Sequence, residues 1–457
     1  MARGPVPSWV WAVLVGAHIL ALGWVLHKGS WDFPDSGRYL QAAENLRVYG
    51  ELYAKPWLRM PPRGQAVQEF TIRPLGYPLA VLGLRAGMNR PVLLLGLQNL
   101  LSLLNIGLVL ALWARWARPK ASQWALAVVG VLSFPAQLIY ANAVMSEMLL
   151  QTAVVVMVSV GLSFIRTQRE QYFAGVAGAS IIALLLKPVF YPLAFVIVGL
   201  GMWLAWRVRR INFAFIGLIP LVVVLLYMGW NKERTGYFHF SSIAEVNLLH
   251  YNAAGVVRQT EGPAAEEKWV ASVLREANSQ PDFAARQHVI QSRAGAVLWA
   301  HPVVYARQHL QGMAALFLDP GRFDVAQFLR LEPSNGAGLL AQAQTGGLWQ
   351  ALGRLPLAML SLLGWVLLAN VVRLVLAARG FLRLKHSEPG LRYGRWVALG
   401  LLLYVAFLTG PLGAARFLVP VWPLLFGLAL MGLPKGPERD ASGADKAAPV
   451  SKDQRQS

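Results

Sequence analysis

The sequence predicts an all-α, polytopic membrane protein with about ten transmembrane helices, on two observations. Hydrophobic residues make up 56% of the 457 positions, whereas charged residues make up only 14%, against roughly 25% in soluble domains. Apolar runs of about 20 residues recur along most of the chain, and each is long enough to cross a hydrocarbon core about 30 Å thick as a helix. A globular fold in water is therefore excluded.

Ten apolar segments are the candidate spans. We interpret the first as a retained helix and not a signal peptide, because it is long and no small-residue cleavage pattern follows it. Pro188 and Pro192 interrupt one long apolar block, so we divide that block into two short spans. The ten spans are residues 9–27, 91–113, 123–140, 147–165, 172–186, 190–206, 211–229, 355–372, 397–414 and 417–433.

The basic residues of the loops predict the orientation of these spans. With a cytoplasmic N-terminus, the short cytoplasmic segments and both termini hold twenty Lys and Arg, whereas the short loops of the other side hold only Lys187 and Arg416. This asymmetry follows the positive-inside rule. It predicts a multi-pass protein of the inner (plasma) membrane with both termini in the cytoplasm. It also explains the net charge of +20 without a nucleic-acid partner.

The spans divide the chain into four parts. Three prolines, Pro263, Pro281 and Pro302, each precede a helical pattern in the long segment between the seventh and eighth spans. The parts are an N-terminal transmembrane module (1–229) with its first outer loop (28–90), a small, mostly helical outer domain (230–354), the C-terminal spans (355–433) and a disordered cytoplasmic tail (434–457).

The composition argues against a metal ion or a cofactor. With no cysteine, the chain can form neither a disulfide nor a thiolate metal site, and its eight histidines lack the spacing of metal ligands. No Gly-rich nucleotide-binding loop is present. We therefore expect neither group.

Two carboxylates, Asp32 and Asp35, directly follow the first span in "WDFPDSGRYL". Residues 36–49 predict a short helix that lies flat at the membrane surface and ends at Gly50. The apolar side of this helix carries Tyr39, Ala43, Leu46 and Tyr49. Either carboxylate could simply cap that helix. Alternatively, one of them is a general base that takes a proton from an acceptor hydroxyl.

Further charged residues lie at the outer ends of the predicted spans. Glu147 lies where a bare carboxylate is costly, so it either reaches water or has a partner. Lys187 and Arg416 could extend to lipid headgroups, or they could hold a phosphate by charge-assisted hydrogen bonds. Their isolation in loops where basic residues are rare favours the phosphate. In the first outer loop, Arg73 precedes Pro74 and an apolar stretch that could be re-entrant or interfacial.

Aromatic and amide residues of the outer segments are candidate contacts for a sugar or an acceptor. The stretch "NKERTGYFHFSSIAEVNLLHYNAAG" is suited to stacking on sugar rings, although an aromatic belt explains it equally well. Within the second span, Gln98, Asn99 and Asn105 predict hydrogen bonds between helices and not a ligand site. The candidate sugar or acceptor residues are Tyr39, Tyr77, Asn247, Tyr251 and Asn252.

Six segments resemble, in their order, the GT-C superfamily of integral-membrane glycosyltransferases, especially its branch of protein O-mannosyltransferases and lipid A aminoarabinose transferases. The similarity covers nearly the whole chain. The segments are "DSGRYLQAAENLRVYGELY", "RPLGYPLAVLG", "YANAVMSEMLL", "LLKPVFYP", "HPVVYARQHLQGM" and "GAARFLVPVWPLL".

This resemblance implies an inverting transfer of a sugar from a polyprenyl-phosphate donor to an acceptor hydroxyl or phosphate at the outer face of the membrane. It implies that Asp35 is the general base, with Asp32 as a neighbour. Glu147 matches the acid of the second outer loop, and Lys187 and Arg416 match positions near the donor phosphate, to which we add Arg73. The partners would be the lipid-linked sugar, membrane lipids and a glycan, lipid or protein acceptor. We expect these anionic and cationic side chains to converge in one pocket.

Two other functions remain open. A transporter or flippase of a lipid-linked saccharide would carry charged groups near the middle of the membrane and matched halves. Here the charged groups lie at outer helix ends, which favours the enzyme. An O-antigen ligase or polymerase would also join lipid-linked glycans on the outer side, with arginines in place of an Asp base.

Overall fold

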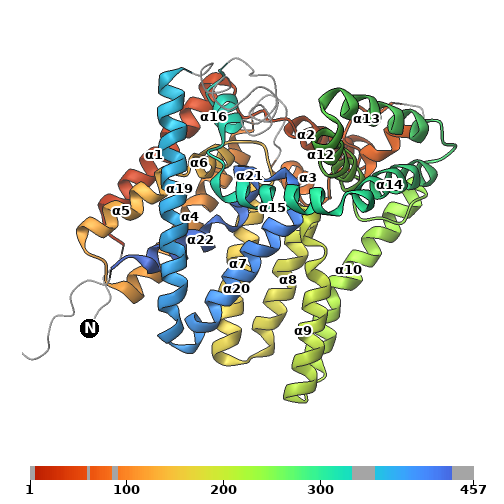
Figure 1. The fold of residues 1–457 in the computed structure, drawn as a ribbon. Coiled ribbons are helices and arrows are strands. Elements are labelled where there is room, and N and C mark those ends of the chain that lie inside the picture. The colour runs from red at the N-terminus through yellow and green to blue at the C-terminus, as the bar shows by residue number, and fades with distance from the viewer. Residues whose placement is uncertain (1–5, 59–61, 85–90, 332–355, 435–457) are drawn as a thin grey trace, which may run out of the picture.

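The computed structural model describes residues 6–58, 62–84, 91–331 and 356–434, and every regular element in these ranges is a helix. Long apolar helices stand side by side as a bundle, with shorter helices gathered at one end (Figure 1). The all-α prediction is thereby confirmed for the described residues. The main helices of the bundle are α1 (Ser8–Lys28), α4 (Val92–Ala117), α7 (Glu147–Thr167), α8 (Glu170–Leu186), α9 (Leu193–Val208), α10 (Asn212–Thr235), α19 (Leu357–Arg383) and α20 (Pro389–Thr409).

All ten predicted spans are helical, but two differ from a simple crossing. Among the described residues, eight helices are long and apolar enough to span a membrane. The predicted span 123–140 is a pair, α5 (Ala121–Leu132) and α6 (Pro135–Ala141), bent by 59° where Pro135 removes a backbone donor. The predicted span 172–186 is α8, a shorter apolar helix of 17 residues.

The last span is built from three consecutive helical pieces. A four-residue turn, α21 (Ala415–Leu418), leads through η6 (Val419–Val421) into α22 (Trp422–Gly432). Between α20 and α21 the chain forms a short helical turn, η5 (Gly410–Leu412). Two further short turns are η2 (Pro188–Phe190), which joins α8 to α9, and η4 (Leu384–His386), which joins α19 to α20.

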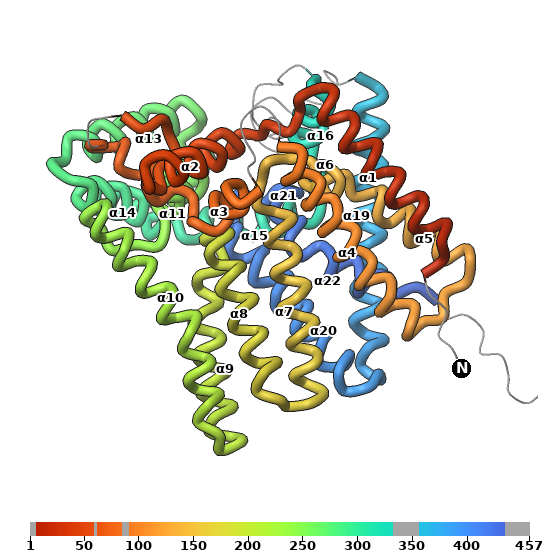
Figure 2. The backbone as a smooth tube through the Cα atoms, turned by 180° about the vertical axis from the view of Figure 1, so that it is seen from behind, coloured from red at the N-terminus to blue at the C-terminus, as the bar shows by residue number. Residues whose placement is uncertain are grey.

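The loops that are rich in Lys and Arg lie together at one end of the bundle, which we call the basic end. Arg166 at the end of α7 pairs with Glu388 before α20, with Nη2 and Oε1 2.5 Å apart. Asn212 at the start of α10 donates to Glu170 at the start of α8. These contacts join three predicted cytoplasmic loops. Figure 2 shows the same arrangement from behind, with the first outer loop and the outer helices at the opposite end.

The segments predicted to be outer contain the expected helix over 36–49 and the helices expected after the three prolines, together with shorter helices that the sequence analysis did not predict. The first outer loop contains α2 (Ser36–Tyr49), η1 (Gly64–Phe70) and α3 (Gly76–Gly83). The outer domain contains α11 (Ile243–Asn247), a π-helical turn η3 (Leu248–Ala253), α12 (Ala254–Glu261), α13 (Pro263–Asn278), α14 (Phe283–Ala300), α15 (Pro302–Leu318) and α16 (Arg322–Phe328). Residues 332–354 of the predicted outer domain and the tail beyond 434 lie outside the described residues.

Two of the three prolines start helices as expected, and the third lies two residues early. Pro263 and Pro302 are the first residues of α13 and α15, where the missing backbone N–H costs nothing. After Pro281 the helix begins at Phe283, because the Asp282 carboxylate accepts a hydrogen bond from the backbone N–H of Ala285 at 2.8 Å and caps α14.

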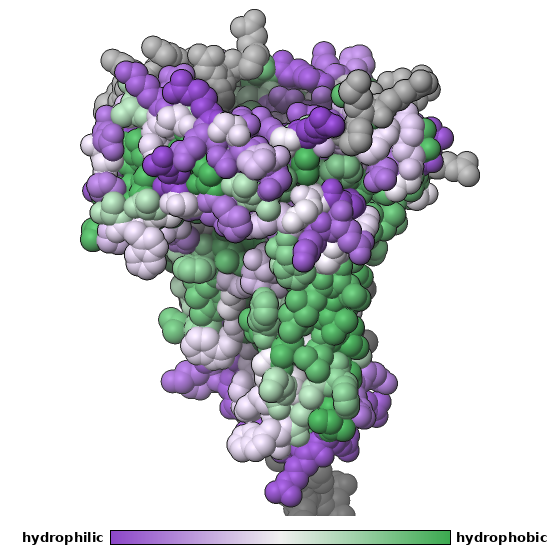
Figure 3. Space-filling view, turned by 90° about the vertical axis from the view of Figure 1, so that its right-hand side faces the viewer, coloured by the Kyte–Doolittle hydropathy of each residue, from purple (hydrophilic) through white to green (hydrophobic). Residues whose placement is uncertain are grey.

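The surface and the interior are divided as a membrane protein requires. In Figure 3 a hydrophobic band covers the bundle below a hydrophilic outer part. Inside, the amides of the second span bond to other helices or to the segment before α7: Gln98 Nε2 donates to the Ala143 carbonyl at 2.8 Å, and Asn105 Nδ2 donates to Gln151 Oε1 at 3.1 Å. Asn99 Nδ2 donates to Asn142 Oδ1. These bonds confirm the predicted structural role of the three amides.

Candidate functional site

Five charged side chains from distant parts of the chain meet in alternating order, and we call them the charge cluster. Arg73 donates to Asp35, whose other oxygen, Oδ2, accepts from Arg416 Nη2 at 2.9 Å. Arg416 Nε also lies 3.5 Å from Glu147 Oε1. The same Glu147 oxygen accepts from Lys187 Nζ at 2.5 Å. The cluster therefore unites five of the six charged candidates of the sequence analysis, and only Asp32 lies outside it.

The cluster lies at the end of the bundle opposite the basic end. Glu147 is the first residue of α7, whose other end carries Arg166 at the basic end, about 30 Å away at 1.5 Å per residue. Lys187 directly follows α8, which begins at the basic end with Glu170. In both α7 and α8, one end therefore lies at the charge cluster and the other at the basic end.

Asp35 occupies the N-cap position of α2 but does not cap it. The Asp35 carboxylate accepts no hydrogen bond from a backbone N–H of the first turn of α2. Instead, Ser36 satisfies the local backbone, because its Oγ accepts from the N–H of Phe33 at 2.9 Å and donates to the carbonyl of Val144 at 3.0 Å. The carboxylate of Asp35 is thereby free to pair with two arginines. The interpretation of Asp35 as a simple helix cap is wrong.

Arg73 is held by the docking of the first outer loop on the segment after α10. Ser241 Oγ donates to the Thr71 carbonyl at 2.7 Å, and Thr71 Oγ1 lies 2.8 Å from Nε2 of His239. On its other side, the guanidinium of Arg73 lies over the ring of Tyr39, 5.5 Å from the ring centroid. Ordering a long arginine side chain costs conformational entropy, and these contacts help to offset that cost.

Lys187 is placed by a close approach of two helices. Gly76 begins α3, and a Cβ atom built on it would lie 2.7 Å from the Leu185 carbonyl oxygen. Only a glycine lets the start of α3 pack this closely against the end of α8. The approach brings Lys187 beside the first outer loop, and its ammonium lies 5.3 Å from the centroid of the Phe417 ring.

Arg416 is positioned by an aspartate that the sequence analysis did not single out. Asp319 Oδ2 accepts from the backbone N–H of Ala415 at 2.8 Å, and Asp319 Oδ1 accepts from Gly321 at 3.0 Å. The carboxylate therefore fixes the start of the short helix α21 that carries Arg416. The Arg416 guanidinium lies 4.9 Å from the centroid of the Phe417 ring. The sequence signal is the turn "DPG" directly after α15.

The electrostatic setting of Asp35 favours its ionised form. Burial by itself raises the pKa of Asp35, but the charges of Arg73 and Arg416 and the hydrogen bond from Arg416 outweigh it and lower the pKa to about 2. The carboxylate is therefore ionised at neutral pH. A carboxylate held by two guanidinium groups is a weak base while both stay in place.

Another buried carboxylate, Asp324, lies near the cluster, and its pKa is raised, whereas that of Asp35 is lowered. Tyr140 donates its hydroxyl to Asp324 Oδ1 at 2.8 Å. Burial raises the pKa of Asp324 to about 7, and the charge of Asp319 adds to this effect, while the bond from Tyr140 opposes it. Burial also raises the pKa of Asp319. Asp324 thus titrates near neutral pH, and no sequence pattern indicated it.

The two candidate tyrosines lie beneath the cluster. Tyr39 and Tyr77 are both buried, and their rings meet edge to face with centroids 4.7 Å apart. The Tyr39 hydroxyl lies 3.3 Å from Ser146 Oγ, and the Tyr77 hydroxyl donates to Gln98 Oε1 at 2.8 Å. In this structure they support Arg73 and the second span.

Four other candidates lie apart from the cluster. The Asp32 side chain is exposed, and Gln327 Nε2 donates to the backbone carbonyl of Asp32. Asn247 and Asn252 bond to each other across the turn η3, where the Asn252 side chain also accepts from Tyr305. Tyr251 is half exposed, and its carbonyl accepts from Gln308.

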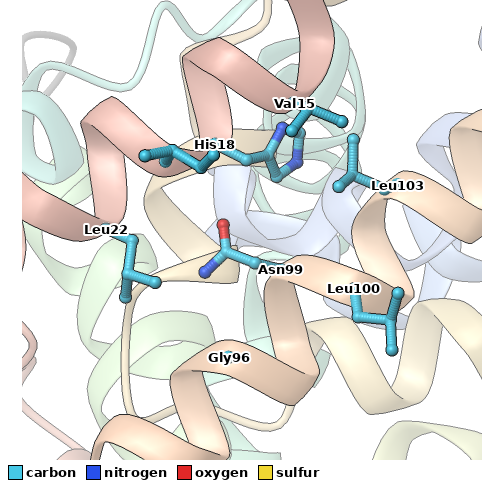
Figure 4. Close-up of a pocket in the computed structure, with 8 residues that line it drawn as sticks. Val15, His18, Leu22, Gly96, Asn99, Leu100 and Leu103 are labelled. Carbon is cyan, nitrogen blue, oxygen red and sulfur yellow. The ribbon is translucent and has the colours of Figure 1, made fainter. Parts of the chain in front are cut away.

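The cavity in Figure 4 is separate from the charge cluster. It has a volume of about 210 Å³ and lies between α1 and α4, with largely apolar walls. Its polar groups are already bonded: His18 Nε2 lies 2.9 Å from Ser102 Oγ, and Asn99 donates to the Leu95 carbonyl at 2.8 Å. Within the described part of the chain, no three His, Asp or Glu side chains are arranged to hold a metal ion.

Comparisons with known proteins give a structural likeness only. No protein-family model and no curated protein sequence matches the chain. Its structure is similar to ArnT from Cupriavidus metallidurans bound to undecaprenyl phosphate, with a TM-score of 0.37 and 17% identity over 93% of this chain and 77% of that one. The apo state of the same protein matches with a TM-score of 0.34 and 17% identity, over 93% and 76%. Likeness at this level does not assign a function, which we argue from the site.

Proposed function

We propose that the chain is a membrane-embedded transferase that moves a sugar from a polyprenyl-phosphate donor to an acceptor, with the charge cluster as its active site. The observation that carries this proposal is the pairing of Asp35 and Glu147 with Arg73, Arg416 and Lys187 at one end of a membrane-spanning bundle. Such a reaction needs a base for the incoming hydroxyl and positive charge for the departing phosphate.

The cluster is suited to an anion because cations outnumber carboxylates. Three cationic side chains face two carboxylates, and the Nε atom of Arg73 is buried without a hydrogen-bond partner. An incoming phosphate would gain charge-assisted hydrogen bonds from Lys187 and the arginines. Because the cluster lies at the ends of apolar spans, it suits an amphiphile whose phosphate is at the membrane surface and whose chain is in the lipid.

In the proposed reaction, the acceptor oxygen forms a bond to the anomeric carbon of the sugar while the bond from that carbon to the phosphate oxygen breaks. The acceptor proton passes to Asp35, and the phosphate leaves as an anion paired with Lys187 and Arg416. Binding of the donor phosphate would draw Arg416 from Asp35. That loss of a counter-charge would raise the pKa of Asp35 from about 2 and make it a stronger base.

The test compares two aspartates that are three residues apart. Purified Asp35→Asn protein is incubated with defined polyprenyl-phosphate sugars and acceptors, and the released polyprenyl phosphate is measured. We expect a loss of about 10²–10⁴-fold in rate, the usual contribution of a positioned base. Asp32→Asn is the matched control and should retain activity, because Asp32 is exposed and outside the cluster.

Donor binding is measured separately in a Lys187→Gln variant. We expect KM for the donor to rise and kcat to fall, because Lys187 would bind the donor phosphate and also stabilise the negative charge that develops as the phosphate departs. Full activity of Asp35→Asn would reject the base assignment. Movement of a lipid-linked saccharide across proteoliposomes without release of polyprenyl phosphate would instead establish a transporter.

A further inference from the structure

A groove near the basic end of the bundle is lined by apolar side chains and one buried arginine. It has a volume of about 120 Å³ and lies between α4, α7, α20 and α22. Its apolar walls include Leu112, Leu162 and Leu428. Among the described residues, Arg395 is the only charged one that lines the groove. On α4 and α20 the lining residues belong to the halves of the helices that lead to the basic end, and no residue of the charge cluster lines the groove.

Arg395 is buried without a counter-charge. The residue is 8% exposed, and Nη1 donates to the carbonyl of Phe381 at 2.8 Å. Its Nε atom is buried and has no hydrogen-bond partner. No carboxylate in the described ranges forms an ion pair with it, and its other contacts are the faces of the Phe381 and Trp396 rings, at 4.7 and 5.4 Å.

A second buried arginine, Arg373 of α19, serves as a comparison, because its guanidinium donates hydrogen bonds to three acceptors of the chain. It donates to Asn370 Oδ1 at 2.5 Å and to the Gly130 carbonyl and Ser133 Oγ, each at 3.1 Å. Arg373 therefore needs no ligand. Arg395, with one acceptor, keeps donors that face the groove, and a buried charge without partners is costly in a membrane segment.

The depth of Arg395 suits a lipid phosphate. It lies six residues after Pro389, the start of α20, which is about 9 Å at 1.5 Å per residue. Its bond to Phe381, near the end of α19, shows that the guanidinium points to the basic end. An arginine at this depth reaches the boundary between headgroups and acyl chains.

The surroundings favour a net negative headgroup. Arg383, Lys385 and Arg392 lie on the adjoining helix ends, and Glu388 of the same loop is already paired with Arg166. A zwitterionic headgroup would bring an ammonium group into this positive region. Basic pockets between transmembrane helices are known lipid-headgroup sites.

We propose that this groove binds one anionic phospholipid, with its phosphate on the Arg395 guanidinium and an acyl chain between α7, α20 and α22. The lipid supplies the anion that the chain itself does not offer, and its chain fills the apolar part of the groove. The site is independent of the proposed transferase reaction.

The experiment measures lipid binding to the purified full chain in detergent by native mass spectrometry, with dioleoyl-phosphatidylglycerol and dioleoyl-phosphatidylcholine as probes. We expect phosphatidylglycerol to bind to the wild type. Arg395→Gln should weaken this binding about tenfold or more, because it removes hydrogen bonds from a charged group to the phosphate. Arg209→Gln is the matched control, because it removes the same charge from an exposed position between α9 and α10, which do not line the groove. Ala398→Phe, which fills the groove, should weaken binding with Arg395 intact.

Three results would overturn the proposal. The first is equal phosphatidylglycerol binding by wild type and Arg395→Gln. The second is equal binding of phosphatidylcholine. The third is full competition by inorganic phosphate, which would show an anion site without a lipid chain. If Arg395→Gln does not fold, Arg395→Lys keeps the charge but loses the planar fork, and unchanged binding in both Arg395→Lys and Ala398→Phe counts against the site.

Discussion

Glu147 is the buried anion on which the charge cluster depends most, so its removal gives the sharpest test of the structure. Its side chain is 0% exposed, and Oε1 receives both Lys187 Nζ at 2.5 Å and Arg416 Nε at 3.5 Å. Glu147→Gln keeps the shape but removes the charge that compensates two buried cations. The cluster would then hold three cations against Asp35 alone.

The expected cost is large because the remaining charges stay out of water. Breaking a buried pair by neutralising one partner typically costs about 3–5 kcal/mol of unfolding free energy. Removing both partners is far milder, so Glu147→Gln combined with Lys187→Met should regain most of that loss. The assay is unfolding of the purified protein by SDS titration in mixed micelles, followed by circular dichroism.

The matched control is the exposed pair at the basic end. Arg166 and Glu388 also lie 2.5 Å apart, but their side chains are 49% and 48% exposed. Glu388→Gln should therefore cost less than about 1 kcal/mol, as exposed pairs do. A loss below about 1 kcal/mol for Glu147→Gln as well, or a double variant no more stable than the single one, would refute the buried cluster.

Two further predictions concern Asp324 and Gly76. Folding raises the pKa of Asp324 from 3.8 to about 7, so the folded state binds more protons between these values and stability falls as pH rises from about 4 to 7. Asp324→Asn should remove up to about 1.4 kcal/mol per pH unit from that decrease in stability. The measurement compares the melting temperatures of the wild type and the variant across this pH range. If stability changes with pH equally in both proteins, the raised pKa of Asp324 is contradicted. Gly76→Ala should destabilise by about 1–3 kcal/mol, since its Cβ would meet the Leu185 carbonyl oxygen at 2.7 Å. Gly83→Ala at the other end of α3 has nothing within 4 Å and should be neutral or slightly stabilising, and equal effects of both changes on thermal unfolding would argue against the close approach.

Local sequence patterns predicted most of the helices. The helix 36–49 and its end at Gly50, where φ is 70°, follow from a short amphipathic segment and a residue that adopts the left-handed conformation freely. On its predicted apolar side Tyr39 and Ala43 are buried, but Tyr49 is exposed. The bend at Pro135 was missed, because hydropathy alone does not distinguish a broken span from a straight one.

The order of residues alone was enough to predict a helical membrane protein with a few prominent charged residues at the ends of its spans, among them Asp35, Glu147, Lys187 and Arg416. Composition and run length suffice to predict the helical membrane fold, because lipid demands apolar surface and internally bonded backbone. The pairing of these charges, and the presence of Asp319 and Asp324 beside them, became visible in the packed helices and not in the sequence. Ion pairs and hydrogen bonds act over a few ångströms, and residues hundreds of positions apart come within that distance only when the helices pack.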